Sequence, residues 1–343
     1  MEPGTGSLRD DERMRLSHQL APLRVVRNKV VNARTGVEVI LRGVNRSGLE
    51  YSSPADPLSS AGISEGEITE IVEHWGATII RLPFNQEWAL QTPGYDPQPY
   101  RTAIEAVVEM AARRGAYTLI DLQWLNARTM RGTVNGQPNY VAPLPSPDSI
   151  VLWEQLGALW RDEPAILFDI FNEPHDVLPD DQEPVLGIRE DGSTFPRLHR
   201  GVGKRGWHAW ARQLIRAIRR VHQDALIFVP GTDWAYDLRD HPLAGVAGVV
   251  YSTHVYPAKR LPWDKAFGEL AEIAPVFVGE WGGGDEDLAW GQRLLSYLEQ
   301  RHIGWTAWSW SDHPRLIEPS TYYTPTRFGA LVKAALCVQT FAS

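Results

Sequence analysis

Two glutamates stand directly after apolar runs of the sequence. Glu173 follows Ile-Leu-Phe-Asp-Ile-Phe-Asn, and Glu280 follows Pro-Val-Phe-Val-Gly. A charged side chain at the end of an apolar run is costly to bury unless it is partnered or used. A pair of carboxyl groups supplies the acid and the nucleophile or base that hydrolysis of a glycosidic bond requires. We therefore predict that Glu173 and Glu280 are a catalytic pair, against the alternative that each is a salt-bridged carboxylate at a strand end.

Other polar side chains also follow apolar runs, and their types suit the support of two carboxyl groups. Arg81 ends one such run, while His254 and Tyr256 follow another. A nearby cation lowers the pKa of a carboxyl group and so favours its ionised form. Arg81 and His254 are therefore predicted partners of the two glutamates. The chain also has 14 tryptophans. Their flat rings suit the apolar faces of sugars, although we expect most of them to pack between helices and strands.

These residues are far apart in the sequence, so the fold must bring strand ends together. Short apolar, β-branched runs alternate with helical patterns, which is typical of repeated β-α units and a parallel sheet. We count eight such runs, at 39–44, 78–82, 117–122, 165–171, 226–229, 248–252, 275–279 and 304–309. Eight units predict an α/β protein with a (β/α)8 TIM barrel, in which the ends of all strands meet at one active-site rim.

Amphipathic patterns lie between these runs. Apolar residues recur at spacings of three and four within 104–111, 152–160 and 207–221. Each segment is therefore predicted to form a helix with one face on the sheet and the other in water. A doubly wound sheet is the alternative fold, but no Gly-x-Gly-x-x-Gly motif follows the first run.

The ends and connections of the chain complete the predicted organisation. Residues 1–18 are polar and charged, and we expect a loose tail. The segments 23–31 and 37–40 flank Asn-Ala-Arg-Thr-Gly and predict a β-hairpin that plugs the barrel floor. Two long connections, 125–147 and 175–204, follow the third and fourth runs, where barrel loops form the active-site face. We find no linker or repeat, so residues 19–343 are predicted to be a single catalytic domain.

The composition narrows the classes of partner. A net charge of -8 argues against broad nucleic-acid binding, and no apolar run reaches the roughly 18 residues that span a bilayer. The one cysteine, Cys337, permits no internal disulfide. The N-terminal residues lack the apolar core of a signal peptide, so we expect a cytoplasmic protein or a secreted one whose leader is removed. No His, Asp and Glu cluster has metal-ligand spacing, and we expect a monomer without a metal or other cofactor.

In combination, the strand-end residues resemble glycoside hydrolase family 5, the cellulase family of retaining barrel enzymes. The resemblance covers about residues 39–310 and rests on Asn172-Glu173-Pro174, Glu280, Arg81-Leu82-Pro83, His254-Val255-Tyr256 and Trp308. It implies that Glu173 is the general acid/base and Glu280 the nucleophile, with their carboxyl groups about 5–5.5 Å apart.

The same resemblance implies supporting roles for the other residues. Arg81 and Tyr256 would contact Glu280, with Arg81 holding it ionised. Asn172 would hydrogen-bond the 2-hydroxyl of the cleaved sugar. His254 would line the site near Glu173, and Trp308 would form the stacking floor under the reacting sugar.

The chain departs from the family pattern at Gln123. Family members often carry a histidine after Asp-Leu, where this chain has Asp121-Leu122-Gln123-Trp124. Gln123 can hydrogen-bond a sugar hydroxyl but carries no charge, so we expect an altered site around the cleaved sugar. Asn45, after the first run, is a candidate substrate contact. The tryptophans that follow strands are candidate sugar platforms, with packing as the alternative for each: Trp124, Trp234, Trp281 and Trp310.

These residues predict a retaining β-glycoside hydrolase that acts on a β-linked oligo- or polysaccharide, most simply an endo-β-1,4-glucanase. A β-mannanase and an exo-acting β-glucosidase are the alternatives within this class. A non-catalytic carbohydrate-binding barrel and a barrel enzyme that uses phosphate or metal chemistry are the alternatives outside it.

Overall fold

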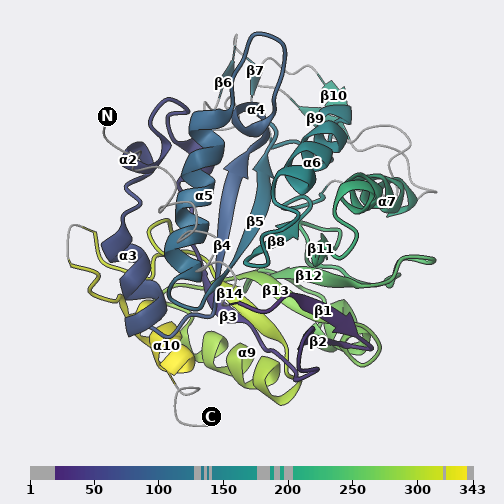
Figure 1. Cartoon of the computed structure of the whole chain (residues 1–343). Helices are drawn as coiled ribbons and strands as arrows, with labels where there is room; N and C mark the ends of the chain where they lie inside the picture. Colours follow the sequence, from purple (N-terminus) through teal and green to yellow (C-terminus); the bar gives the residue numbers. More distant parts are fainter. Residues whose placement is uncertain are drawn as a thin grey trace, which may run out of the picture.

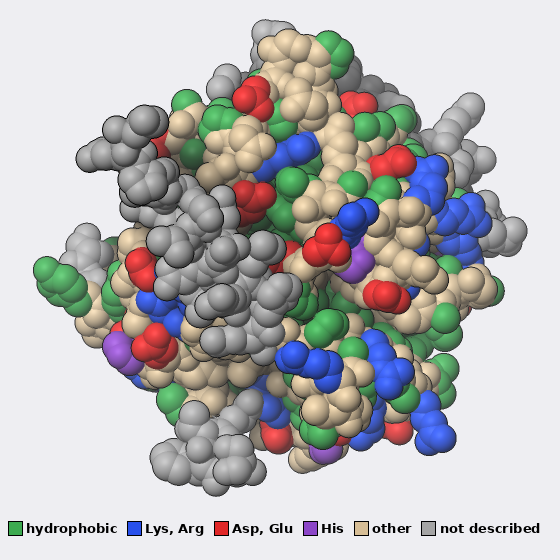
Figure 2. Space-filling model, viewed as in Figure 1, with side chains coloured by type: hydrophobic (Ala, Val, Ile, Leu, Met, Phe, Trp, Pro, Cys, Tyr) green, Lys and Arg blue, Asp and Glu red, His purple; other side chains and the backbone are tan. Residues whose placement is uncertain are grey.

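The computed structural model describes residues 20–126, 133–134, 137–138, 141–175, 186–188, 194–196, 204–319 and 322–337. The predicted tail, residues 1–18, lies outside these ranges, as do parts of both long connections. Within these ranges, no helix combines the length and apolar composition needed to cross a membrane. Side chains of both charge signs are distributed over the face shown in Figure 2.

Eight parallel strands close into a barrel (Figure 1), so the predicted (β/α)8 architecture is confirmed. In order around the barrel they are β3 (Arg42–Asn45), β4 (Ile79–Asn85), β5 (Tyr117–Trp124), β8 (Ile166–Asp169), β11 (Ile227–Pro230), β12 (Val249–Val255), β13 (Val276–Trp281) and β14 (Gly304–Ala307). The last strand, β14, pairs back to β3. Each strand overlaps one of the eight apolar runs.

Helices pack around the outside of the barrel (Figure 1). The longer ones are α5 (Gln98–Ala112), α6 (Pro147–Leu159), α7 (Lys204–Val221), α9 (Leu288–Gln300) and α10 (Arg327–Cys337). The three segments with helical periodicity form α5, α6 and α7, as predicted. Outward-facing strand residues meet these helices: Phe84 of β4 packs edge-on against Trp153 of α6, with ring centroids 5.8 Å apart.

Short elements complete the chain. The helical ones are η1 (Leu49–Tyr51), α2 (Pro57–Ala61), α3 (Glu65–Thr69), η2 (Glu70–His74), α4 (Gln86–Ala89), η4 (Asp264–Gly268) and α8 (Glu269–Ala271). The two-stranded pairs outside the barrel are β1 (Leu23–Val26) with β2 (Lys29–Asn32), β6 (Thr133–Val134) with β7 (Gln137–Pro138), and β9 (Leu186–Ile188) with β10 (Thr194–Pro196).

The barrel interior changes from apolar to polar along several of its strands. Leu119, Leu167 and Val250 belong to an apolar cluster inside the barrel. Two residues further along the same strands come Asp121, Asp169 and Ser252, all fully buried. Because strand side chains alternate with a period of two, these polar residues face the same interior, nearer the active-site rim. The polar layer is therefore built into the barrel below the strand ends.

The N-terminal hairpin differs in register from the prediction. The strands β1 and β2, except for the last residue of β2, lie within the segment 23–31 that we expected to be the first strand, and Leu23 pairs with Asn32. Arg27 adopts a left-handed φ of 57° and closes the tight turn between them. The predicted turn at residues 32–36 is also present, because Asn32 accepts hydrogen bonds from the backbone of Arg34 and Thr35. Beyond it, Glu38 makes an isolated bridge with Val31.

Candidate active site

A bulge in β13 aims Glu280 into the barrel. Thr253 of β12 pairs with Val278, but the next residue, His254, pairs with Glu280, so β13 holds one extra residue at Gly279. A bulge of this kind re-aims side chains and is common beside active sites. It turns both Gly279 and Glu280 toward the interior. A Cβ at Gly279 would lie 2.6 Å from Ser252 Oγ, so glycine is required at this close approach.

Glu280 is held by two donors and is 4% exposed. Arg81 Nη1 donates to its Oε1 at 2.9 Å, and the Tyr256 hydroxyl donates to its Oε2 at 2.8 Å. The contacts of Arg81 and Tyr256 are those implied by the resemblance, and they fix both oxygens of Glu280.

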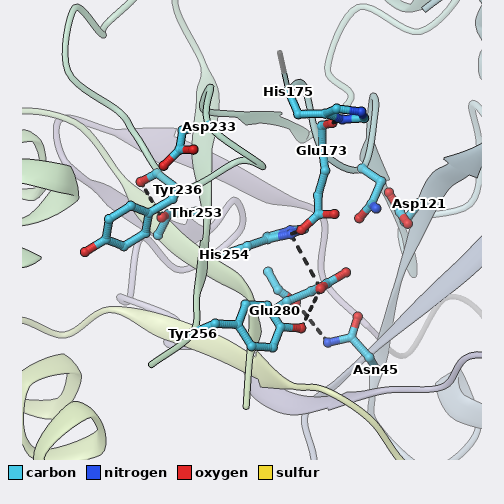
Figure 3. A network of polar contacts seen from close by, with 12 residues as sticks. Asn45, Asp121, Glu173, His175, Asp233, Tyr236, Thr253, His254, Tyr256 and Glu280 are labelled. Carbon is cyan, nitrogen blue, oxygen red and sulfur yellow. Dashed lines mark hydrogen bonds and ion pairs between the residues drawn. The ribbon is translucent and has the colours of Figure 1, made fainter. Parts of the chain in front are cut away.

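In the view of Figure 3, Glu173 lies above His254 and Glu280 lies below it, and both approach the same ring nitrogen. His254 Nδ1 is 2.9 Å from Glu173 Oε1 and 3.5 Å from Glu280 Oε2. Burial raises the pKa of Glu173 to about 7, although Arg81, His175 and Lys259 each act to lower it. Burial also lowers the pKa of His254 to about 3, so its ring is neutral at ordinary pH. Near neutral pH the site therefore contains a protonatable Glu173 beside a neutral imidazole.

One oxygen of Glu173, one of Glu280 and a nitrogen of His254 lie within 4.8 Å of one another. This proximity fits the short separation of the two carboxyl groups in retaining glycosidases, which is about 5–5.5 Å. These three atoms are also of types that ligate metal ions. Among the described residues, they form the group of possible metal ligands whose atoms all lie within 4.8 Å of one another.

Arg81 is the centre of the polar layer beneath the glutamates. Its guanidinium is fully buried and directs its N–H groups at different residues. The hydrogen-bond acceptors are Asn45 Oδ1, Asn172 Oδ1, Asp169 Oδ2 and Glu280 Oε1, each at 2.9 Å, and Asp121 Oδ1 is 3.0 Å away. Residues from β3, β5, β8 and β13 are thereby fixed around one side chain of β4.

The remaining predicted site residues differ in how deeply they are buried. Asn45 is fully buried and donates to Gly279 O at 2.9 Å, so it supports Arg81 and the bulge from below. Gln123 is 9% exposed and its Oε1 has no hydrogen-bond partner among the described residues. Trp124 is half-buried beside Tyr51, with ring centroids 6.1 Å apart. Trp308 is half-buried at the rim.

Two of the candidate tryptophans are packing residues in this structure. Trp281 and Trp310 have no exposed surface. Trp281 packs edge-on against Trp305 at 5.6 Å and Phe328 at 5.4 Å, in the shell between barrel and helices. The expectation that Trp281 stacks on substrate is therefore corrected: the bulge that turns Glu280 inward turns the next side chain outward.

Trp234, by contrast, is 40% exposed. Its ring stacks on His175, with centroids 3.7 Å apart and an interplanar angle of 6°. His175 Nδ1 in turn donates to the backbone oxygen of Glu173 at 2.7 Å. Asp233, Trp234 and Ala235 all have positive φ. Strained backbone of this kind clusters at functional sites.

Sequence reasoning missed three of these residues. His175 was not assigned a role, nor were Asp121 and Asp169 beneath the site. For the two aspartates, the sequence did contain a signal. Each lies within an apolar run, Thr-Leu-Ile-Asp-Leu or Ile-Leu-Phe-Asp-Ile, and a buried charge needs a partner.

Comparison with known families identifies the barrel. Residues 34–314 match the family described as Cellulase (glycosyl hydrolase family 5). The chain belongs to glycosyl hydrolase family 5. Glu173 and Glu280 of this family 5 chain thus lie in the matched region, as do all the other predicted site residues.

Relatives of the family 5 chain are distant. Endoglucanase MaCel5A of Microbulbifer sp. (strain ALW1) is 26% identical over 309 residues, covering 84% of this chain and 51% of that protein. Endoglucanase E-5 of Thermobifida fusca is 23% identical over 308 residues, covering 83% and 56%. The chain thus spans about half the length of these curated relatives.

Solved structures share the fold. The β-glucanase SdGluc5_26A of Saccharophagus degradans, in complex with cellotetraose, superposes with a TM-score of 0.71 at 21% identity, covering 93% of each chain. The catalytic domain of Thermobifida fusca endoglucanase Cel5A (E5) gives a TM-score of 0.68 at 20% identity, covering 94% of this chain and 99% of that one.

Proposed function

We propose that this protein is a retaining endo-β-1,4-glucanase that cleaves β-linked glucan by double displacement. The observation that carries the proposal is the arrangement of Glu173 and Glu280, whose nearest oxygens lie within 4.8 Å across one barrel rim. The relatives named above are endoglucanases, and a β-glucanase of the same fold binds cellotetraose.

In the first step, Glu280 attacks the anomeric carbon while Glu173 donates its proton to the leaving oxygen. The glycosidic bond breaks, and the sugar becomes covalently bound to Glu280. In the second step, the ionised Glu173 takes a proton from water, the hydroxyl attacks the anomeric carbon, and Glu280 leaves. Both carboxyl groups regain their starting forms, so no external co-reactant is consumed.

The surroundings of each carboxyl group suit its step. Glu280 is oriented by Arg81 and Tyr256, which each donate a hydrogen bond to one of its two oxygens. Glu173 begins protonated because burial raises its pKa to about 7, and a general acid works best with a pKa near the operating pH. Asn172 accepts from Arg81 through Oδ1, which leaves its Nδ2 group to donate to a sugar hydroxyl.

Exposed aromatic rings support a chain-like substrate. Trp234, backed by His175 next to the acid Glu173, offers a platform on the leaving-group side. Trp124 and Tyr51 form a second aromatic pair at the rim. Platforms on separate loops suit a substrate with several sugar units. Trp308 and Gln123 complete the subsite of the cleaved sugar in this proposal.

The test compares wild-type protein on soluble cellulose, glucomannan and aryl β-glycosides. Endo action on β-1,4-glucan predicts a fast loss of viscosity relative to the release of reducing ends. Preference for glucomannan would instead indicate a β-mannanase, and release of glucose alone an exo-acting β-glucosidase. Sugar binding without turnover would indicate a non-catalytic barrel. Full activity of Glu280→Ala on the best substrate would refute the assignment of the nucleophile.

We also propose that residues 19–343 act as one catalytic unit whose hairpin covers the barrel floor. Leu23 of β1 joins the interior cluster with Leu41, Tyr117 and Leu226. The Tyr117 hydroxyl donates to the backbone oxygen of Ala21 at 2.7 Å. Removal of residues 1–32 should then lower the melting temperature, whereas removal of residues 1–18 should leave it unchanged.

A further inference from the structure

The guanidinium of Arg81 is surrounded by more carboxyl groups than its single charge can balance. Asp169 Oδ2 lies 2.9 Å from Nε, Glu280 Oε1 lies 2.9 Å from Nη1, and Asp121 Oδ1 lies 3.0 Å from Nη2. Arg81 and the two aspartates have no exposed surface. An unbalanced charge in such an interior is strongly destabilising. Three ionised carboxylates around one cation are therefore disfavoured.

The hydrogen bonds show which carboxyl group differs from the others. Asp169 and Glu280 each accept a well-aligned hydrogen bond from Arg81. Asp121 is at ion-pair distance, yet neither of its buried oxygens has a hydrogen-bond partner among the described residues. The second oxygen of Asp169, Oδ1, is likewise buried without a partner. An ionised, buried carboxylate without hydrogen bonds is costly, so Asp121 is the group least suited to carry a charge.

Asp121 and Asp169 lie next to each other. They are register partners on the adjacent parallel strands β5 and β8, which are about 4.8 Å apart in a sheet. Both side chains point at Arg81, so both enter the same interior. Two carboxyl groups that share a site hold a proton between them, because like charges at this range disfavour double ionisation. One proton on Asp121 would join one of its two unpartnered oxygens to the unpartnered Oδ1 of Asp169.

Three of the four other charged groups around Asp121 favour its protonated form. The four groups that face it are Arg81 from β4, Asp169 from β8, Glu280 from β13 and Glu50 from η1. Burial, the largest effect, and the three acids raise the pKa of Asp121 well above its ordinary value, against the opposing effect of Arg81. Burial raises the pKa of Asp169 only to about 6, because Arg81 both pairs with it and hydrogen-bonds it.

We propose that Asp121 is protonated in the working enzyme and donates its O–H to Asp169 Oδ1, so that Asp169 is the ionised group that shares Arg81 with Glu280. Asp121 and Asp169 are then positioning residues that act through Arg81. Asp169 offsets part of the guanidinium charge, which limits how strongly Arg81 stabilises the carboxylate of Glu280. This inference rests on the proposed role of Glu280 as nucleophile, but the location of the proton does not.

The first experiment locates the proton independently of activity. Infrared difference spectra between wild type and Asp121→Asn are recorded near pH 7, in H2O and D2O. The proposal predicts that the substitution removes a deuterium-sensitive carboxylic-acid C=O band and leaves the carboxylate bands unchanged. Loss of carboxylate bands instead would overturn it. This measurement also decides the question if the second variant below does not fold.

The second experiment measures the effect on the nucleophile with the matched pair Asp121→Asn and Asp169→Asn. The acid limb of the pH profile of kcat/KM reports protonation of the nucleophile in the free enzyme. Asp121→Asn removes no charge, so that limb should keep its midpoint even if kcat falls. Asp169→Asn removes a negative charge next to Arg81, so the midpoint should fall by about one pH unit or more. Any other pattern overturns the proposal, including a midpoint that moves in both variants or in neither. Inactivity of wild type would instead refute the proposed function.

Discussion

Replacement of Glu173 by glutamine should stabilise the fold while it abolishes acid catalysis. Burial raises the pKa of Glu173 from its ordinary 4.5 to about 7, so the folded protein holds this proton more tightly than the unfolded chain does. The resulting stability is fully present below about pH 4.5 and is lost as the pH rises through about 7. Each pKa unit corresponds to about 1.36 kcal/mol, so the loss is roughly 3 kcal/mol. Glu173→Gln has no proton to lose and avoids this cost.

Urea unfolding of wild type and Glu173→Gln at a series of pH values measures this effect. The two free energies of unfolding should differ little below about pH 4.5, and the variant should gain roughly 3 kcal/mol above about pH 7. Glu272→Gln is the matched control, because Glu272 is exposed. Its profile should run parallel to that of wild type. If the Glu173→Gln profile also runs parallel, the protonated, buried state assigned to Glu173 is refuted.

The same variant separates acid catalysis from nucleophilic attack. Loss of a general acid typically costs about 10²–10⁴ in rate, and the cost should be largest for polysaccharide, whose leaving alcohol needs a proton. An aryl β-glycoside with an acidic phenol needs little protonation, so its first step should remain fast. An equal loss of kcat/KM on both substrates would contradict the acid role of Glu173.

Three further results are expected. Tyr256→Phe removes the 2.8 Å hydrogen bond to Glu280; a bond to a charged group contributes about 1.5–3 kcal/mol, so kcat/KM should fall roughly 10- to 100-fold, and an unchanged value would show that Tyr256 does not support the nucleophile. Trp234→Ala removes the exposed ring stacked on His175; KM for oligosaccharides should rise about three- to tenfold, while an equal rise for a short aryl glycoside would argue against a leaving-group platform. Dialysis against a chelator should leave activity intact, because the double displacement needs only the two carboxyl groups; loss that Mg²⁺ or Ca²⁺ restores would reveal a metal requirement.

Much of the fold could be predicted because local patterns encode it. Each barrel strand is buried on both faces, so it reads as a short apolar run. The helices α5, α6 and α7 cover the barrel with one face only, so their apolar residues recur every three or four positions. The hairpin was harder, because two turns lie within ten residues and the choice of paired strands depends on Arg27 adopting a left-handed backbone.

The candidate site was predictable to the extent that its residues stand at strand ends. Glu173, Glu280, Arg81, His254 and Tyr256 all follow or end apolar runs, and a barrel brings such positions to one rim. The direction in which each side chain points was not predictable, because the sequence does not reveal a β-bulge. The extra residue in β13 turns Glu280 inward and Trp281 outward, whereas strict alternation from Val278 would have done the reverse.

By itself, the sequence determined the eight-unit barrel and the family and predicted the two glutamates, because strand and helix periodicity and strand-end residues are local properties of the chain. Only the tertiary structure decided how those glutamates are tuned. The pKa of Glu173 depends on burial, and the ionisation of the Arg81 cluster depends on Asp121 and Asp169 meeting across two strands. Burial and the distance between charges are set by the packing of residues remote in sequence, and these quantities determine where protons reside in the site.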